Sequence, residues 1–217
     1  MLRVEPRDGD AARKDDFSCL VRHADAVLVL ARGILVAALP DARWAPAVSN
    51  LGYTVGFLIV ILGRIQLFTG NTVMTNMLGC LLAAAVLAHV QILPTAQFEG
   101  LLDVARHYAK ATAMQQLTWG IPAGFLIASL VWIIPRMTGA GEVLVIVMLT
   151  YVIGLGGMSH VVAGSTELFV LLLHSELSLG QVTLRGIAPA LAGNVIGGTG
   201  MFAALTYTQV RKEVPHT

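Results

Sequence analysis

One ionisable side chain, His160, lies in the middle of a long apolar stretch. Residues 143–158 carry no charge, glycines stand on both sides of the histidine, and a second apolar run covers residues 168–173. Inside a lipid bilayer, irregular backbone survives only where protein covers it or where it lines a cavity. An ionisable residue at such a position is a candidate for function. The stretch therefore predicts a break in a membrane-spanning segment, with His160 on a pathway across the membrane.

The chemistry available to His160 is proton exchange coupled to anion binding. An imidazole changes charge at accessible pH, a bound anion favours its charged form, and desolvation favours its neutral form. For a weak acid such as formic or nitrous acid, His160 could donate a proton to the anion. The neutral acid would then cross a dry constriction against a far lower barrier than the anion. The alternative is a packing histidine bonded to a carbonyl group.

Two other chemistries fit the sequence poorly. His160, Glu167 and His174 follow one another at intervals of seven residues. Consecutive members would lie about 10.5 Å apart along a helix, which one metal ion cannot bridge. Ser165 lacks the following glycine that keeps a serine nucleophile accessible. We therefore expect no enzyme, no metal and no cofactor; Glu167 either faces the pore or pairs with Arg64.

The composition is that of an integral membrane protein. Of the 217 residues, 56% are hydrophobic and 12% are charged, whereas soluble domains carry about 25% charged residues. The net charge of +1 gives no reason to expect a nucleic-acid partner. We expect one transmembrane channel domain over residues 26–210, between a charged cytoplasmic tail (residues 1–25) and a short cytoplasmic tail (residues 211–217).

Apolar runs within this domain indicate an all-α bundle of about six transmembrane helices, two of them broken. The first run, residues 26–39, is short and contains Arg32. It either lies in the membrane interface or spans the membrane with Arg32 reaching the surface or facing protein. Residues 98–108 are mildly amphipathic and predict a surface helix. The other expected apolar segments cover residues 44–63, 77–93, 114–135, 143–173 and 187–209.

A second break is expected near Thr69, where Gly70 and Asn71 favour a turn. Its layout matches that of the His160 segment, as in inverted repeats whose broken helices meet near the midplane. Helix N-termini at such breaks favour an anion. Thr69 would offer a hydroxyl to that anion, and Phe68 and Leu67 would form an apolar gate unless they belong to the ordinary core.

Glycine spacing and positive charge complete the architecture. GxxxG spacings occur in three segments and let helices pack closely: Gly52/Gly56, Gly120/Gly124 and Gly193/Gly197. Five Lys and Arg residues precede the first span, and Arg211 and Lys212 follow the last. Because positive residues favour the cytoplasmic side, we expect both termini to lie in the cytoplasm.

Three blocks resemble the formate/nitrite transporter family, and most closely its YfdC-like bacterial branch. They are Gln66-Leu-Phe-Thr-Gly-Asn-Thr72, Gly157-Met-Ser-His-Val-Val-Ala163, and Gly193-Asn-Val-Ile-Gly-Gly-Thr-Gly200 with Leu205-Thr-Tyr207. The resemblance implies an aquaporin-like protomer in a homopentamer, each protomer with a pore for small monovalent anions. It places His160 on the family's central histidine, Thr69 on its loop threonine, and Phe68 and Leu67 beside a constriction.

The chain departs from the family pattern in polarity and in length. Gln66 and Ser159 stand where the family commonly has acidic residues, which changes the polarity of the expected pore lining. From Thr72 the chain passes almost directly to a motif of the family's third helix, so part of the second and third helices is missing. Either residues 73–93 replace what was lost, or the protein is a degraded relative.

The expected function is therefore an anion channel or transporter, with a proton-linked mode of transport. The rival is a non-conducting or vestigial membrane scaffold of the same fold. A neutral-solute channel of aquaglyceroporin type is disfavoured because no Asn-Pro-Ala pair exists.

Overall fold

The computed structural model describes residues 24–39, 44–62, 70–90 and 92–210, and this part of the chain contains helices and no strand. The N-terminal half forms α2 (Ala24–Ala38), α3 (Ala45–Leu62), α4 (Gly70–His89) and α5 (Thr95–Ala109). The C-terminal half forms α6 (Ala113–Ile133), the short η1 (Ile134–Arg136), α7 (Ala140–Leu155) and α8 (Val161–Leu173). A final continuous helical run comprises η2 (Gln181–Ile187), α9 (Ala188–Val195), η3 (Ile196–Phe202) and α10 (Ala203–Val210).

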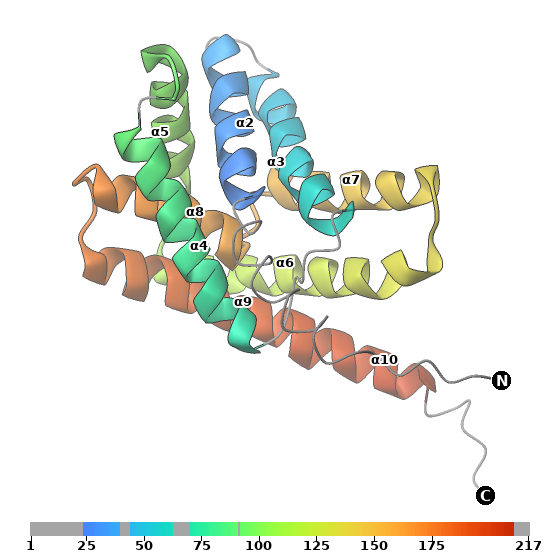
Figure 1. Cartoon of the computed structure of the whole chain (residues 1–217). Coiled ribbons are helices and arrows are strands. Elements are labelled where there is room, and N and C mark those ends of the chain that lie inside the picture. The colour runs from blue at the N-terminus through green and yellow to red at the C-terminus, as the bar shows by residue number, and fades with distance from the viewer. Residues whose placement is uncertain (1–23, 40–43, 63–69, 91, 211–217) are drawn as a thin grey trace, which may run out of the picture.

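Helix pairs recur in the two halves of the chain. In the first half, α2 packs against both α3 and α5, and in the second half α6 packs against α7 and α9. Figure 1 shows α6 in yellow-green and α7 in yellow side by side, above the long C-terminal run in red, while α2 and α3 stand together across them. The halves meet where α3 packs on α7 and α4 packs on α8.

Within the described ranges, two helical segments are long and apolar enough to cross a membrane by themselves, Ala113–Arg136 and Gln181–Thr208. Shorter apolar stretches lie within the other helices: Val29–Ala38, Ala47–Ile59, Asn76–His89, Ala140–Leu155 and Val161–Leu173. The last two belong to the expected span over residues 143–173, and the interruption between them confirms the predicted broken helix.

The glycine spacings mark close helix contacts. A Cβ atom added at Gly193 or Gly197 would overlap the carbonyl oxygen of Leu117 or Ile121, and one added at Gly124 would overlap Asn194. The α6–α9 crossing thus uses both GxxxG spacings of the second half, as predicted. Gly52 similarly lies against the backbone of α2.

The close packing of α6 against η3 predicts that alanine substitutions at two glycines of η3 change stability by different amounts. Gly197→Ala should lower the stability of the detergent-solubilised protein by about 1–3 kcal/mol, because its methyl group meets the Ile121 carbonyl. Gly200→Ala is the matched control, since nothing lies within 4 Å of an added Cβ, and it should change stability by less than about 0.5 kcal/mol. Unfolding titrations of both variants measure the difference. Equal stabilities of the two variants would contradict the close contact of α6 with η3 at Gly197.

Three predicted features differ from the structure. The expected surface helix, α5, is a packed member of the bundle: Leu101 and Leu102 are fully buried, and α5 contacts α2 and α8. Its mild amphipathicity reflects one face turned to protein. Gly70 and Asn71 were expected in a turn, but they lie within the first turn of α4. The C-terminal span also begins earlier than predicted, at Gln181 instead of residue 187.

Arg106 ties α5 to the segment after α8. Its guanidinium donates to both carboxylate oxygens of Glu176, at 2.9 and 2.7 Å, and these hydrogen bonds lower the pKa of Glu176. A lowered folded-state pKa means that the carboxylate stabilises the fold above its unfolded pKa and loses this contribution as pH falls through the folded value. Because the pair is partly exposed, Glu176→Gln should cost at most about 1 kcal/mol, and the cost should vanish in acid unfolding titrations.

Candidate functional site

The break between α7 and α8 is built by its glycines. α7 ends at Leu155, and Gly157 follows with φ +60°, a left-handed conformation that glycine adopts at little cost. The Met158 N–H donates to the Ile153 carbonyl at 3.0 Å, and the Ser159 N–H donates to the Trp119 carbonyl at 3.2 Å. The chain thus turns back against α6 before α8 begins.

His160 is the N-cap residue of α8. Its Nδ1 accepts a hydrogen bond from the Ala163 N–H at 3.5 Å, a long bond that uses the unprotonated nitrogen of a neutral imidazole. The side chain is 6% exposed. The Phe57 ring of α3 meets the imidazole edge to face, with ring centroids 5.3 Å apart, and Tyr53 stacks on Phe57 at 5.1 Å. An ionisable group therefore sits at a helix N-terminus with an aromatic pair on one side.

Asn194 of α9 holds the break in place. Its side-chain amide donates to the carbonyl of Ser159 at 2.7 Å and to that of Gly120 at 2.9 Å, and its oxygen accepts from the Val161 N–H at 2.9 Å. Three backbone groups, from α6, the break and α8, are thereby satisfied by one buried side chain. Asn194 therefore fixes the position of His160 relative to α6.

A buried ion pair joins α2 to α8. The guanidinium Nη1 of Arg32, from α2, is 2.9 Å from Oε1 of Glu167, and the two side chains are 18% and 2% exposed. The guanidinium carbon of Arg32 also lies 5.8 Å from the centre of the Tyr53 ring. The partner considered for Glu167 from the sequence, Arg64, lies outside the described residues; in the structure Glu167 pairs with Arg32 and also lines the cavity described below. For the first apolar run, the alternative in which Arg32 faces protein is confirmed.

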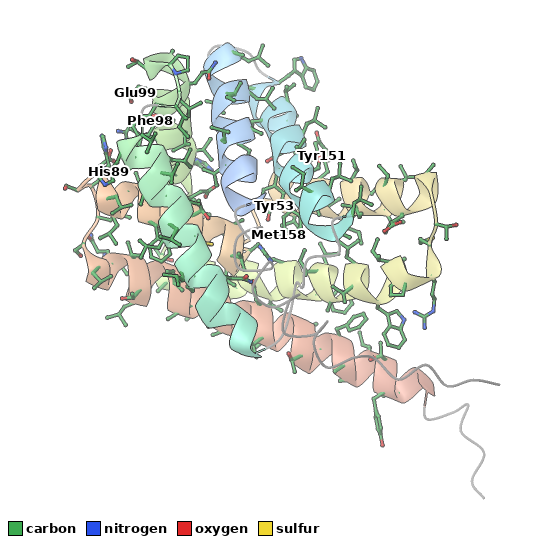
Figure 2. The ribbon with its side chains drawn as sticks, viewed as in Figure 1. Tyr53, His89, Phe98, Glu99, Tyr151 and Met158 are labelled. Atoms are coloured by element: carbon green, nitrogen blue, oxygen red, sulfur yellow. The ribbon has the colours of Figure 1, made fainter. Side chains whose placement is uncertain are left out.

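These groups share one cavity of about 150 Å³. A single water molecule needs about 10–15 Å³ on the same measure, so the cavity has room for a small anion with water. Figure 2 labels two residues of its wall, Tyr53 from the middle of α3 and Met158 from the break between α7 and α8. The polar members of the wall are Arg32, Tyr53, His107, Tyr108, Gln116, Ser159, His160 and Glu167.

Tyr108 of α5 forms one side of this cavity. Its ring occupies the space beside Gly164, where an added Cβ would overlap it. Gln116 is fully buried and donates from its amide nitrogen to the Tyr108 carbonyl at 3.2 Å. The packing of α5 against α8, which the sequence analysis did not foresee, therefore supplies a wall of the cavity.

Comparison with known proteins found a family model and a relative that each match more than half of the chain. The family model "Formate/nitrite transporter" matches residues 72–208. The inner membrane protein YfdC of Escherichia coli (strain K12) is 31% identical over 240 residues, which cover 96% of this chain and 77% of that protein. The chain belongs to the formate/nitrite transporter family.

Two further similarities are more distant. Formate-nitrite transporter 3 of Toxoplasma gondii (strain ATCC 50611 / Me49) is 25% identical over 70% of this chain and 36% of its own length. A solved structure, a pentameric formate channel with formate bound, superimposes with a TM-score of 0.76 over 95% of this chain and 100% of that chain, at 15% identity. The fold of this formate/nitrite transporter family member is thus the all-α membrane fold that the sequence predicted.

Of the predicted site residues, the structure brings Ser159 and His160 together in the cavity wall. Leu67, Phe68 and Thr69 lie outside the described residues, and also before the first residue of the family match. Ser165 donates its hydroxyl to the Val161 carbonyl at 2.6 Å, an ordinary bond within its own helix. In the described part of this family member, no group of three metal-ligating side chains comes together.

Several cavity residues were missed by sequence reasoning. Arg32 carried a signal, since it is the one charge within the first apolar run. Asn194, which holds the break but does not line the cavity, lies within a block that resembled the family. Tyr53, Tyr108 and Gln116 carried none, because an isolated polar or aromatic residue in an apolar segment does not reveal which neighbour it faces.

Helix α4 packs beside the break between α7 and α8. α4 follows α3 after only residues 63–69 and packs along α8. The Cys80 thiol donates to the Val162 carbonyl at 3.4 Å, directly beside the break.

Proposed function

We propose that this chain is a membrane channel or transporter for small monovalent anions of the formate and nitrite type, and that its transport is linked to protons through His160. The observation that carries the proposal is the position of His160: it caps the N-terminus of α8 at a helix break and lines a cavity of about 150 Å³. The positive end of the helix dipole favours an anion at this point.

The cavity supports a simple sequence of events. An anion enters from the side of Arg32 and approaches the imidazolium form of His160, which donates its proton and returns to the neutral form. The neutral acid then passes the apolar side of the site, where the Phe57 ring lies, because an uncharged molecule loses little on leaving water. In this proposal Ser159 and the loop residues Leu67, Phe68 and Thr69 line the path on either side of the histidine.

The surface of the protein is consistent with a bilayer and with further copies of the chain. Large apolar side chains are exposed on α3, α4, α6 and α7, among them Leu51, Leu82, Trp119 and Leu144. We propose a homopentamer in the bacterial inner membrane, a transmembrane domain over residues 26–210, and cytoplasmic tails over residues 1–25 and 211–217. The protein would be a channel or transporter without enzymatic activity or a cofactor.

Reconstitution into liposomes tests the proposal. Formate and nitrite influx should exceed that of empty liposomes and should rise from about pH 8 to about pH 5, as more imidazole is protonated. Glycerol influx should stay at the level of empty liposomes. The rival scaffold function predicts no flux of any solute from correctly folded protein, and glycerol flux without anion flux would indicate a neutral-solute channel.

A further inference from the structure

Arg32 and Glu167 leave part of each other's hydrogen-bonding capacity unused. Their contact joins Nη1 to Oε1 at 2.9 Å. The Arg32 Nε and the Glu167 Oε2 are both buried and have no hydrogen-bond partner among the described residues. Helices α2 and α8 are in contact, and buried apolar residues of both, Val29 and Leu171 among them, belong to one hydrophobic cluster. The pair thus places two charged side chains in the cavity wall, each with one polar atom that has no partner among the described residues.

Arg32 has the donor chemistry to bind an oxyanion in the cavity. A guanidinium is a planar fork of N–H donors that matches carboxylate geometry, and Arg32 lines the cavity with a buried Nε. Glu167 lines the same cavity, and its carboxylate both neutralises Arg32 and repels an entering anion. Binding of an anion to Arg32 thus requires that the negative charge on Glu167 be removed.

We propose that Arg32 is an anion-binding residue of the cavity and that Glu167 controls it. Uptake of one proton converts the Glu167 carboxylate to the neutral acid, releases Arg32 from the ion pair, and lets Arg32 bind a small carboxylate-type anion. The choice of anion rests on the proposed function. The net charge of the wall plus its occupant is zero before and after, because one proton and one anion enter together. No uncompensated charge is created in a poorly solvated site, where it would be costly.

The other ionisable groups near Glu167 come from several helices. α3 supplies Tyr53, α5 supplies His107 and Tyr108, and the N-cap of α8 supplies His160. α4 places the Cys80 thiol beside the α8 backbone. The other helices packed on α8, η2 and α9, place no described residue in the cavity wall. A neutral replacement of Glu167 leaves all of these groups in place and isolates its contribution.

Binding can be followed by the fluorescence of Trp119, which lines the cavity. In a Trp44→Phe/Trp132→Phe background, sodium formate is titrated into the detergent-solubilised protein at about pH 8, 7, 6 and 5. The parent protein should bind formate about tenfold more tightly at the lowest pH than at the highest. Glu167→Gln should bind formate more tightly than the parent at the highest pH, so that the affinity ratio across the range falls clearly below the parent's value of about 10. The pH dependence that remains is the contribution of His160.

Two further variants complete the test. Arg32→Gln/Glu167→Gln removes both charges at nearly constant volume and should bind formate at least about tenfold more weakly than Glu167→Gln at every pH. Arg32→Lys keeps the charge and should keep the pH dependence with a lower affinity, because a lysine lacks the planar fork. The inference is overturned if Glu167→Gln keeps the parent's pH dependence, or if the double variant binds as tightly as Glu167→Gln.

The binding result is independent of transport. Formate binding that follows Glu167 without flux in liposomes would uphold this site and contradict the proposed function. Flux with binding that ignores Arg32 and Glu167 would uphold the proposed function and overturn the inference.

Discussion

Replacing Asn194 with leucine should be among the most damaging single changes in this protein. The side-chain amide of Asn194 forms hydrogen bonds of 2.7–2.9 Å with one backbone group each of Gly120, Ser159 and Val161. Leucine can form none of these hydrogen bonds. Each buried group left without a partner costs about 1–3 kcal/mol, so the total loss should exceed about 3 kcal/mol. Fluorescence-detected size-exclusion chromatography after heating should show a much lower midpoint and little material at room temperature.

Val195→Leu provides the control, since its side chain is 44% exposed and adds one methylene in the same helix. It should behave as the parent protein. If Asn194→Leu were as stable as this control, the hydrogen bonds of Asn194 would not hold the break, and the placement of His160 would need another cause. Asn194→Asp should be intermediate, because its carboxylate can still accept from the Val161 N–H but cannot donate to either carbonyl.

The second large effect should fall on transport. His160→Asn should reduce formate flux by at least about 100-fold, because proton transfer by a positioned side chain commonly contributes about 10²–10⁴-fold. Asparagine is a favourable N-cap residue, so α8 should still begin at Val161 and the fold should persist. What is lost is the proton that the imidazole supplies. Stopped-flow measurements on liposomes with equal amounts of inserted protein give the ratio.

His174→Asn is the matched control for this variant. His174 follows the other end of α8 and packs edge to face on Phe98, with centroids 5.7 Å apart, and it does not belong to the cavity wall. It should retain the parent flux and its rise at acidic pH. Unchanged flux in His160→Asn would show that the histidine is a capping and packing residue, which is the alternative that the sequence analysis left open.

The second half of the fold could be predicted from the sequence in some detail. Two apolar runs separated by Gly156, Gly157 and a lone histidine can form a continuous span only with a break, and the structure places the break there. The Gly120/Gly124 and Gly193/Gly197 spacings likewise indicated a close crossing, because only glycine allows a carbonyl oxygen of one helix to approach the backbone of another.

Contacts between distant segments could not be predicted in this way. Arg32 and Glu167 are 135 residues apart, and an isolated charge in an apolar run does not reveal which other charge it meets. The amphipathic pattern of α5 has the same difficulty, since a helix with one apolar face looks alike whether that face meets lipid headgroups or, as here, α2 and α8. The sequence therefore predicted the helix break at His160, but not the contacts of α2 and α5 that enclose it.

Covalent blocking of the cavity tests the central claim most directly. In a Cys19→Ser/Cys80→Ala background, Met158→Cys places a single thiol in the cavity wall, beside the helix break (Figure 2). An anionic methanethiosulfonate reagent should abolish most of the formate flux of this variant, excess formate should slow the labelling, and the background protein should be unaffected. Complete labelling of the introduced thiol, measured by mass spectrometry, with unchanged formate flux would contradict the account, because anions would then cross by a route that avoids His160.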